Sequence, residues 1–220
     1  MLRFRCFVVP FVVATALSLV PRSASADDLV SGGASHGVVS RIKRGVKEVG
    51  VESLFATSYD KVNGGSSALQ LTVIGGLGFR YFVADNVALA LNGGALFDTS
   101  DRSGTHRDVA GYGTLSAAYY VAVGGGLMLA PTIGAGGFYG GRTENGTPDL
   151  VHATLAGGLA RGGLGLVFYP SSRVNLFARP EAIAFFGKAT PEATTATPSP
   201  TSSSFTRVTG GFTVGANIVF

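Results

Sequence analysis

Residues 69–83 read LQLTVIGGLGFRYFV, and the alternation in this stretch decides how the rest of the chain is interpreted. Its odd positions are almost all large and apolar, whereas its even positions carry small, polar or charged residues together with Ile74 and Phe82. Successive side chains of a β-strand point to opposite faces, so a period of two predicts a strand with one strongly apolar face. We therefore expect residues 69–83 to form such a strand.

The same alternation recurs along the chain and predicts eight strands in all. The other seven cover 51–59, 87–97, 109–121, 127–139, 151–168, 174–186 and 206–220. The stretch 151–168 is irregular, because its first apolar residues occupy odd positions and its last ones occupy even positions. The glycines between them predict a β-bulge that shifts the phase.

The connections between these strands alternate in length. Short ones lie near 84–86, 122–126 and 169–173, and longer polar ones lie at 60–67, 98–108, 140–149 and 187–204. Bacterial outer-membrane barrels have an even number of strands, short periplasmic turns and longer external loops. The pattern therefore predicts an all-β fold, a closed antiparallel up-and-down transmembrane β-barrel of about eight strands, over residues 50–220.

Composition indicates which face of the strands points outward. Charged residues make up 14% of the chain, against roughly 25% in soluble domains, and 33 of the 220 residues are glycine. The second face of the strands is mostly small and weakly polar, which suits the narrow lumen of an eight-stranded barrel. We expect the apolar face to contact outer-membrane lipid, with aromatic girdles at both interfaces. The aromatic residues predicted to form these girdles are Tyr59, Phe79, Tyr81, Phe97, Tyr119, Tyr139, Phe168 and Phe186.

Residues 1–26 have the features of a cleaved signal peptide. Arg3 and Arg5 precede an apolar run over 7–20, and a small-residue cleavage site follows at Ala24-Ser-Ala26. The alternative is a membrane-anchoring helix, but the run is shorter than the 18 or so residues that favour a spanning helix. We expect export and cleavage, with residues 27–49 as a periplasmic lead-in to the barrel. Cys6, the single cysteine, lies in the predicted signal.

The charge balance argues against nucleic-acid binding. Removal of Arg3, Arg5 and Arg22 leaves 14 of the 17 basic residues against 13 acidic ones. Nucleic-acid binding requires a basic patch, and the mature chain has little net charge with which to form one. One basic cluster remains before the first strand, formed by Arg41, Lys43, Arg44 and Lys47. Two interpretations stay open for it: a solvated helical turn, or a contact with anionic lipid head groups.

The last strand carries a family resemblance. Together with the signal peptide and the eight alternating strands, the terminal stretch from Phe212 to Phe220 resembles outer-membrane barrels of the OmpA/OmpX type. The resemblance covers roughly residues 50–220. It implies that Phe220, a C-terminal aromatic residue on an alternating strand, is the signal that the barrel assembly machinery binds.

Polar residues on the second face define the candidate site. They are Glu52, Gln70, Arg80, Asn92, Tyr112, Asn175, Arg179, Glu181, Arg207 and Asn217. Buried charges must be paired, so we predict a lumen network in which Glu52 and Glu181 bind Arg80 and Arg179, with Asn92 and Tyr112 beside them. Such a network either only fills the barrel or lines a narrow, gated path for water or ions.

The sequence indicates no catalytic centre and no cofactor or metal site. The three histidines, His36, His106 and His152, have no metal-ligand spacing. Lipid hydrolysis through His152 and Ser204 is an enzymatic alternative without a sequence signature. We expect a non-enzymatic barrel with a structural or narrow passive-pore role. The alternative is a surface-binding or adhesion module that acts through the long external loops.

Overall fold

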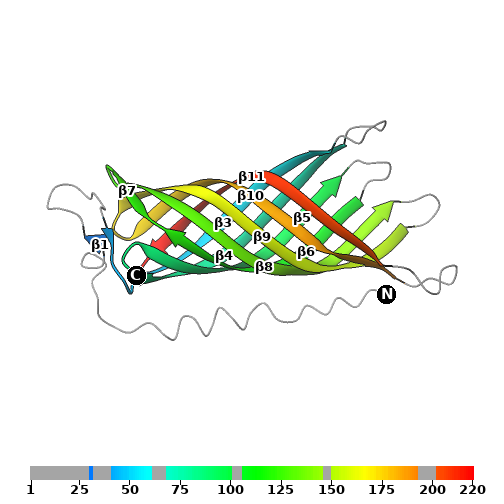
Figure 1. Ribbon diagram of the computed structural model, residues 1–220, viewed down its shortest axis with the longest axis horizontal. Coiled ribbons are helices and arrows are strands. Elements are labelled where there is room, and N and C mark those ends of the chain that lie inside the picture. Colours follow the sequence, from blue (N-terminus) through cyan, green and yellow to red (C-terminus); the bar gives the residue numbers. More distant parts are fainter. Residues whose placement is uncertain (1–29, 32–40, 61–67, 101–105, 146–149, 193–201) are drawn as a thin grey trace.

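The chain folds into a single long barrel of antiparallel strands, seen from the side in Figure 1. This computed structural model describes residues 30–31, 41–60, 68–100, 106–145, 150–192 and 202–220. No helix within these ranges is long and apolar enough to cross a membrane. The strands are β1 (Val30–Ser31), β2 (Arg41–Ile42), β3 (Lys47–Asp60), β4 (Ala68–Ala84), β5 (Val87–Ser100), β6 (His106–Tyr119), β7 (Val121–Gly124), β8 (Leu127–Asn145), β9 (Leu150–Ser171), β10 (Val174–Pro191) and β11 (Ser203–Val219).

The ring closes, and the predicted number of strands is confirmed. The hydrogen-bonded order is β6-β5-β4-β3-β11-β10-β9-β8-β7, and β6 also pairs with β8. The first and last barrel strands meet along β3 and β11, from Glu48 opposite Val219 to Thr57 opposite Gly210. Since β6 and β7 follow one another along β8, they form one crossing strand, and the barrel has eight. The remaining two strands, β1 and β2, form a separate small sheet.

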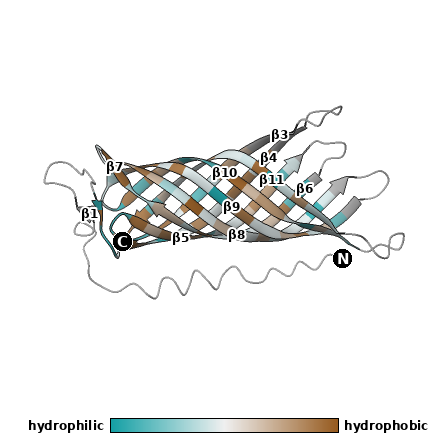
Figure 2. Ribbon diagram, in the orientation of Figure 1, coloured by the Kyte–Doolittle hydropathy of each residue, from teal (hydrophilic) through white to brown (hydrophobic). Residues whose placement is uncertain are grey.

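The apolar face points outward, as predicted. Leu115, Ile133 and Val208 are 59%, 72% and 67% exposed, whereas the alternate positions of the same strands are mostly buried. Figure 2 shows this alternation as brown and teal along the strands. The outward apolar positions run from Val109 to Tyr119 on β6, a length close to the 9–11 tilted residues that cross a bilayer. We call this band of outward apolar side chains the belt.

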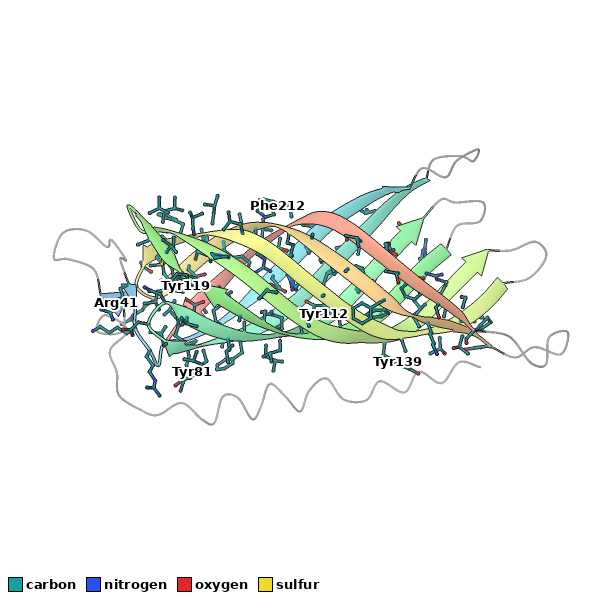
Figure 3. The ribbon with its side chains drawn as sticks, viewed as in Figure 1. Arg41, Tyr81, Tyr112, Tyr119, Tyr139 and Phe212 are labelled. Atoms are coloured by element: carbon teal, nitrogen blue, oxygen red, sulfur yellow. The ribbon has the colours of Figure 1, made fainter. Side chains whose placement is uncertain are left out.

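The two ends of the barrel differ. One end, here called the turn end, carries the turns at residues 85–86, 125–126 and 172–173 and the residue Phe220, and the opposite end is called the loop end (Figure 1). In Figure 3, Tyr81 and Tyr119 lie near the turn end, whereas Tyr139 lies toward the loop end. Aromatic residues on the outward face therefore lie at both edges of the belt, as is typical of membrane proteins at the two interfaces.

The strands extend farther toward the loop end than the sequence predicted. Parts of the stretches 98–108, 140–149 and 187–204, predicted as loops, belong to strands: β5 reaches Ser100, β6 begins at His106, β8 reaches Asn145, β10 reaches Pro191 and β11 begins at Ser203. Asp98 and Asp108, predicted as loop charges, are buried strand residues that face the lumen. The prediction was wrong because polar side chains were taken as a loop signal, although the strands continue beyond the belt.

The predicted bulge in 151–168 is absent. The β8–β9 register is unbroken from Leu127 opposite Phe168 to Asn145 opposite Leu150. Leu155 and Leu159 are each only 2% exposed and face the lumen, whereas Leu164 on the other face is 48% exposed. The apparent change of phase therefore reflects an apolar layer inside the barrel rather than a shift of the strand.

Candidate functional site

Side chains fill the lumen in layers, described here from the turn end to the loop end. The first layer includes residues 41–46, which precede β3 and are here called the plug. Ile42 and Val46 are fully buried and pack in one cluster with Phe82, Tyr120 and Met128. The Gly45 amide donates a hydrogen bond of 2.8 Å to the Phe82 carbonyl, and Gly45 adopts a φ of +94°, which favours glycine. The segment is thus a short strand and a turn, so the helical turn, one of the two interpretations left open for this basic cluster, was wrong.

The turn between β4 and β5 holds the plug in place. The Ile42 amide donates to Asn86 Oδ1 at 2.8 Å, and the Asn86 amide donates to the Ile42 carbonyl at 2.9 Å. Asp85 accepts a hydrogen bond of 2.8 Å from the Arg44 amide and forms an ion pair with Arg41. These contacts lower the pKa of the Asp85 carboxyl below its usual range, and the hydrogen bond from the Arg44 amide has the largest effect.

Above the plug lies a first ionic cluster around Glu48. This carboxylate is fully buried and accepts hydrogen bonds from Tyr169 and from the Asn175 side-chain amide, each of 2.8 Å. It also pairs with Arg80, which stands directly opposite on β4, at 2.5 Å. Asn217 donates a hydrogen bond of 2.7 Å to Asn175 and extends the cluster to β11.

Four residues farther along β3 lies a second ionic cluster, the central quartet of Glu52, Arg161, Arg179 and Glu181. Arg161 donates to Glu181 at 2.9 and 2.7 Å and to Glu52 at 2.8 Å. Arg179 lies 3.4 Å from Glu52 and 3.3 Å from Glu181. All four side chains are at least nine-tenths buried, and their two positive and two negative charges balance. Thr213 also donates a hydrogen bond to Glu181.

Glycine makes room for the central quartet. In the strand register, Glu52 stands between Gly76 and Gly215, and Glu181 stands between Gly163 and Gly211. A Cβ atom added to Gly163 would lie 2.5 Å from the Pro180 carbonyl oxygen and 2.7 Å from Glu181 Cβ. The small neighbours therefore let long charged side chains meet across a narrow lumen.

Two further layers follow toward the loop end. The first is apolar and contains Leu54, Ile74, Leu96, Phe138, Leu155, Leu159, Ile183 and Phe185. The second is ionic: Asp98 binds Arg207 at 2.5 Å, and Asp108 accepts two hydrogen bonds of 2.8 Å from Arg142. Asp98 and Asp108 stand directly opposite one another in the register. Each of these carboxylates is thus neutralised by its own arginine.

The structure brings together only part of the predicted network. Arg179 lies with Glu52 and Glu181, but Arg80 belongs to the separate Glu48 cluster. Phe177 separates the two arginines, since its ring centre is 5.9 Å from the Arg80 guanidinium and 5.8 Å from that of Arg179. The Gln70 side chain lies outside the described residues.

Asn92 and Tyr112 lie beside these clusters and are each 8% exposed. Asn92, Arg80 and Glu52 line a cavity of about 10 Å³, which is room for roughly one water molecule. The Tyr112 hydroxyl is buried and has no hydrogen-bond partner among the described residues. The lumen is therefore packed between the two ionic clusters rather than open.

Arg161 and Glu48 are the two charged residues of the Glu48 cluster and the central quartet that the sequence analysis missed. It also missed Tyr169 and Thr213, which donate hydrogen bonds to Glu48 and Glu181, and the loop-end residues Asp98, Asp108 and Arg142. Arg161 is a single charge in a Gly/Ala-rich strand, and a charge facing lipid costs roughly 2–4 kcal/mol at the membrane midplane. This cost alone would have assigned Arg161 to the lumen. Glu48 shares the parity of Glu52, but the predicted strand began at residue 51 and left Glu48 in the lead-in.

The residues of the enzymatic alternative do not meet. His152 and Ser204 are exposed, on β9 and β11. Ser204 stands opposite Lys188, and Lys188 stands opposite Ala156, four residues along β9 from His152. An intervening strand and four residues therefore separate the two side chains. The side chain of His106 and the whole of His36 lie outside the described residues.

Comparison with known proteins identifies the fold. No family model and no curated protein matches the chain. The outer-membrane protein OprG from Pseudomonas aeruginosa is 16% identical with a TM-score of 0.50, over 84% of this chain and 98% of OprG. The N-terminal barrel domain of Pseudomonas aeruginosa OprF is 17% identical with a TM-score of 0.39, over 79% of this chain and 97% of that domain. AlkL, solved in lipid bilayers, is 16% identical with a TM-score of 0.46, over 86% of this chain and 95% of AlkL. The likeness to OprG, together with the closed eight-stranded ring, shows that the chain has the fold of small outer-membrane β-barrels.

Proposed function

We propose that this protein is a structural barrel of the bacterial outer membrane whose lumen is closed to ions and solutes. The observation that carries the proposal is the unbroken filling of the lumen. From the turn end, it consists of the Ile42/Val46 plug, the Glu48 cluster, the central quartet and the apolar layer. The turn end would face the periplasm, as short turns do in this class of barrel.

Several barriers in series support closure better than a gated passive pore. Rearranging the central quartet alone would leave the plug on one side and the apolar layer on the other. An apolar constriction blocks ions by dewetting even where its geometry leaves a gap. A single change in the quartet is therefore not expected to create a conducting path.

Conductance across planar lipid bilayers tests this proposal. We expect no conductance steps from the refolded wild-type protein, nor from Glu181→Ala, since the plug and the apolar layer remain in both. The quadruple variant Ile42→Ala/Glu48→Ala/Glu181→Ala/Phe138→Ala, which weakens all four layers at once, is expected to conduct. Steady steps from wild type that change with Glu181→Ala would overturn the structural role and establish the narrow pore.

A surface-binding role is the second candidate, and the strand extensions favour it. Three strands extend beyond the belt at the loop end: β8 ends at Asn145, β9 begins at Leu150, and β10 ends at Pro191. The belt edge at Tyr139 thus lies several residues below the ends of these strands, which form a stem that would hold the external loops away from lipid. A deletion limited to residues 193–201 tests this role, because it spares β10 and β11. Loss of binding to host or neighbouring cells by a deletion variant that still folds would support it, and unchanged binding would count against it.

A further inference from the structure

The turn end of the barrel carries a strong excess of positive charge. Among the described residues there, Arg41, Lys43, Arg44 and Arg173 are exposed, Lys47 is half-exposed, and one acidic residue, Asp85, is half-exposed. These five basic residues are here called the collar. At the loop end, the described exposed charges are those of Arg107, Lys188 and Glu192, and the half-exposed Arg142 and Arg207 are paired with the buried Asp108 and Asp98. Without the predicted signal peptide the chain has 14 basic and 13 acidic residues, so this distribution concentrates positive charge at one interface.

The collar borders the lower edge of the belt. The Lys47 amide donates to the Phe220 carbonyl at 3.1 Å, the Phe220 amide donates back at 2.8 Å, and Lys47 stands opposite Tyr81 on β4. All three residues occupy outward positions, and the next outward residue on β3 is Val49, which is 45% exposed in the belt. Lys47 therefore projects sideways between two aromatic residues at the level where lipid head groups begin.

The remaining cations extend this positive surface around the mouth of the barrel. Lys43 and Arg44 are exposed on the turn of the plug, and Arg173 is exposed in the β9–β10 turn. The Arg173 carbonyl accepts a hydrogen bond of 2.8 Å from the Val219 amide, so this turn lies beside the end of β11 and close to Phe220. Figure 3 places Arg41 at the same end, beyond Tyr81 and Tyr119.

From this arrangement we infer that the collar binds the head groups of acidic phospholipids in the leaflet at the turn end. A lipid phosphate at the belt edge is within reach of Lys47, whereas a water-soluble acidic polymer would contact only the cations around the mouth. Each Lys or Arg near an anionic surface strengthens binding by roughly fivefold. The collar would thus select acidic lipids for the first lipid shell and fix the depth of the barrel in the membrane.

Lipid selectivity measured by electron spin resonance tests the inference. The refolded protein is placed in phosphatidylcholine bilayers, and the protein-bound fraction is compared for spin-labelled phosphatidylglycerol and spin-labelled phosphatidylcholine. We expect the acidic probe to be preferred severalfold by the wild type. The preference should fall by about half or more in Lys43→Gln/Lys47→Gln, and also at about 1 M salt, where the Debye length is near 3 Å.

A matched variant controls for the loss of two charges. Arg107→Gln/Lys188→Gln removes two exposed cations from the loop end and should change the preference much less. Heat-dependent gel mobility confirms that each variant is folded. Equal losses in both variants, or no preference in the wild type, would overturn the inference. The inference would also be overturned if the wild type showed no lipid selectivity but sedimented with purified peptidoglycan, and Lys43→Gln/Lys47→Gln did not. That result would show that the collar binds an acidic glycan instead. Neither outcome bears on the conductance test of the proposed function.

Discussion

Arg161 on β9 donates a hydrogen bond of 2.8 Å to Glu52 on β3, across the lumen between strands three places apart in the ring. Neighbouring strands are already joined by their backbone ladders, but this bond joins distant parts of the wall. The same guanidinium makes two hydrogen bonds to Glu181, so one side chain ties three strands together. Arg161 thus fixes the cross-section of the barrel at the level of the central quartet.

Arg161→Ala should destabilise the barrel far more than Arg179→Ala. Loss of Arg161 leaves the two buried carboxylates with the longer contacts of Arg179 and, at Glu181, the hydrogen bond from Thr213, and breaking a buried pair in this way costs about 3–5 kcal/mol. Loss of Arg179 leaves all three Arg161 hydrogen bonds in place, so we expect a smaller loss of roughly 1–3 kcal/mol. Urea unfolding in lipid vesicles, followed by circular dichroism because the chain contains no tryptophan, measures both. Equal costs would contradict the assignment of Arg161 as the central residue.

A methyl group at Gly163 should be poorly tolerated. The added Cβ would meet the Pro180 carbonyl oxygen and Glu181 Cβ at 2.5 and 2.7 Å, and overpacking of this kind costs about 1–3 kcal/mol. Gly113→Ala is the matched control, because a Cβ at this outward position would meet nothing within 4 Å, and its cost should stay within about 0.5 kcal/mol. The same unfolding measurement applies. If both substitutions prove neutral, the central quartet is more loosely packed than described here.

Acid should weaken the attachment of the plug at Asp85. Because its contacts with Arg44 and Arg41 lower the pKa of Asp85, the stability that they provide is present above the usual value of 3.8 and is lost as the pH falls through the lowered pKa. Hydrogen exchange of the Arg44 amide, corrected for its intrinsic rate, should therefore lose protection in this acidic range. Asp85→Ala, which removes the acceptor of the Arg44 amide, should reproduce the loss at pH 6, while the Val219 amide, which bonds to Arg173, stays protected. Unaltered protection of Arg44 in Asp85→Ala would exclude a role for this carboxylate.

Phe220→Ala tests whether this residue is an assembly signal. Its side chain is 48% exposed on the lipid face, and its backbone pairing with Lys47 does not depend on the ring. We expect refolding in detergent to be retained but the amount of folded barrel in the outer membrane of cells to fall severalfold. Phe212→Ala is the matched control, since Phe212 lies on the same strand and is 47% exposed. A similar fall in both variants would show that lost apolar contacts, and not recognition, explain the effect.

The sequence was sufficient for the barrel because each strand had to present one face to lipid. A lipid-facing strand has little freedom to vary, so residues such as Leu115 and Val208 identify their face unambiguously. The lumen face carries no comparable constraint. Leu155 and Leu159 are as apolar as any belt residue, and only the neighbouring strands show that they point inward.

The partners within the lumen were harder to predict than its residues. Glu52, Arg179 and Glu181 were assigned to the lumen, but Glu52 lies far from Arg161 in sequence and meets it only through closure of the ring. Arg80 was grouped with Glu52 and Glu181 although Glu48 stands directly opposite it, because the start of β3 was placed too late. Pairing across a barrel depends on strand register, and a shift of a few residues exchanges one partner for another.

Accessibility of spin labels tests the central claim, that the outward apolar belt contacts lipid, most directly. Cys6 is the chain's only cysteine, so it is the only native one to be replaced. Each variant then carries one spin-labelled cysteine, at Leu115, Ile133 or Val208 in the belt, or at Arg107 or Thr206 beyond it. Labels in the belt should collide with dissolved oxygen and be shielded from a water-soluble nickel complex, and labels beyond it should show the reverse. Equal exposure of both sets to the nickel complex, in a protein that stays monomeric in water without detergent, would contradict the account.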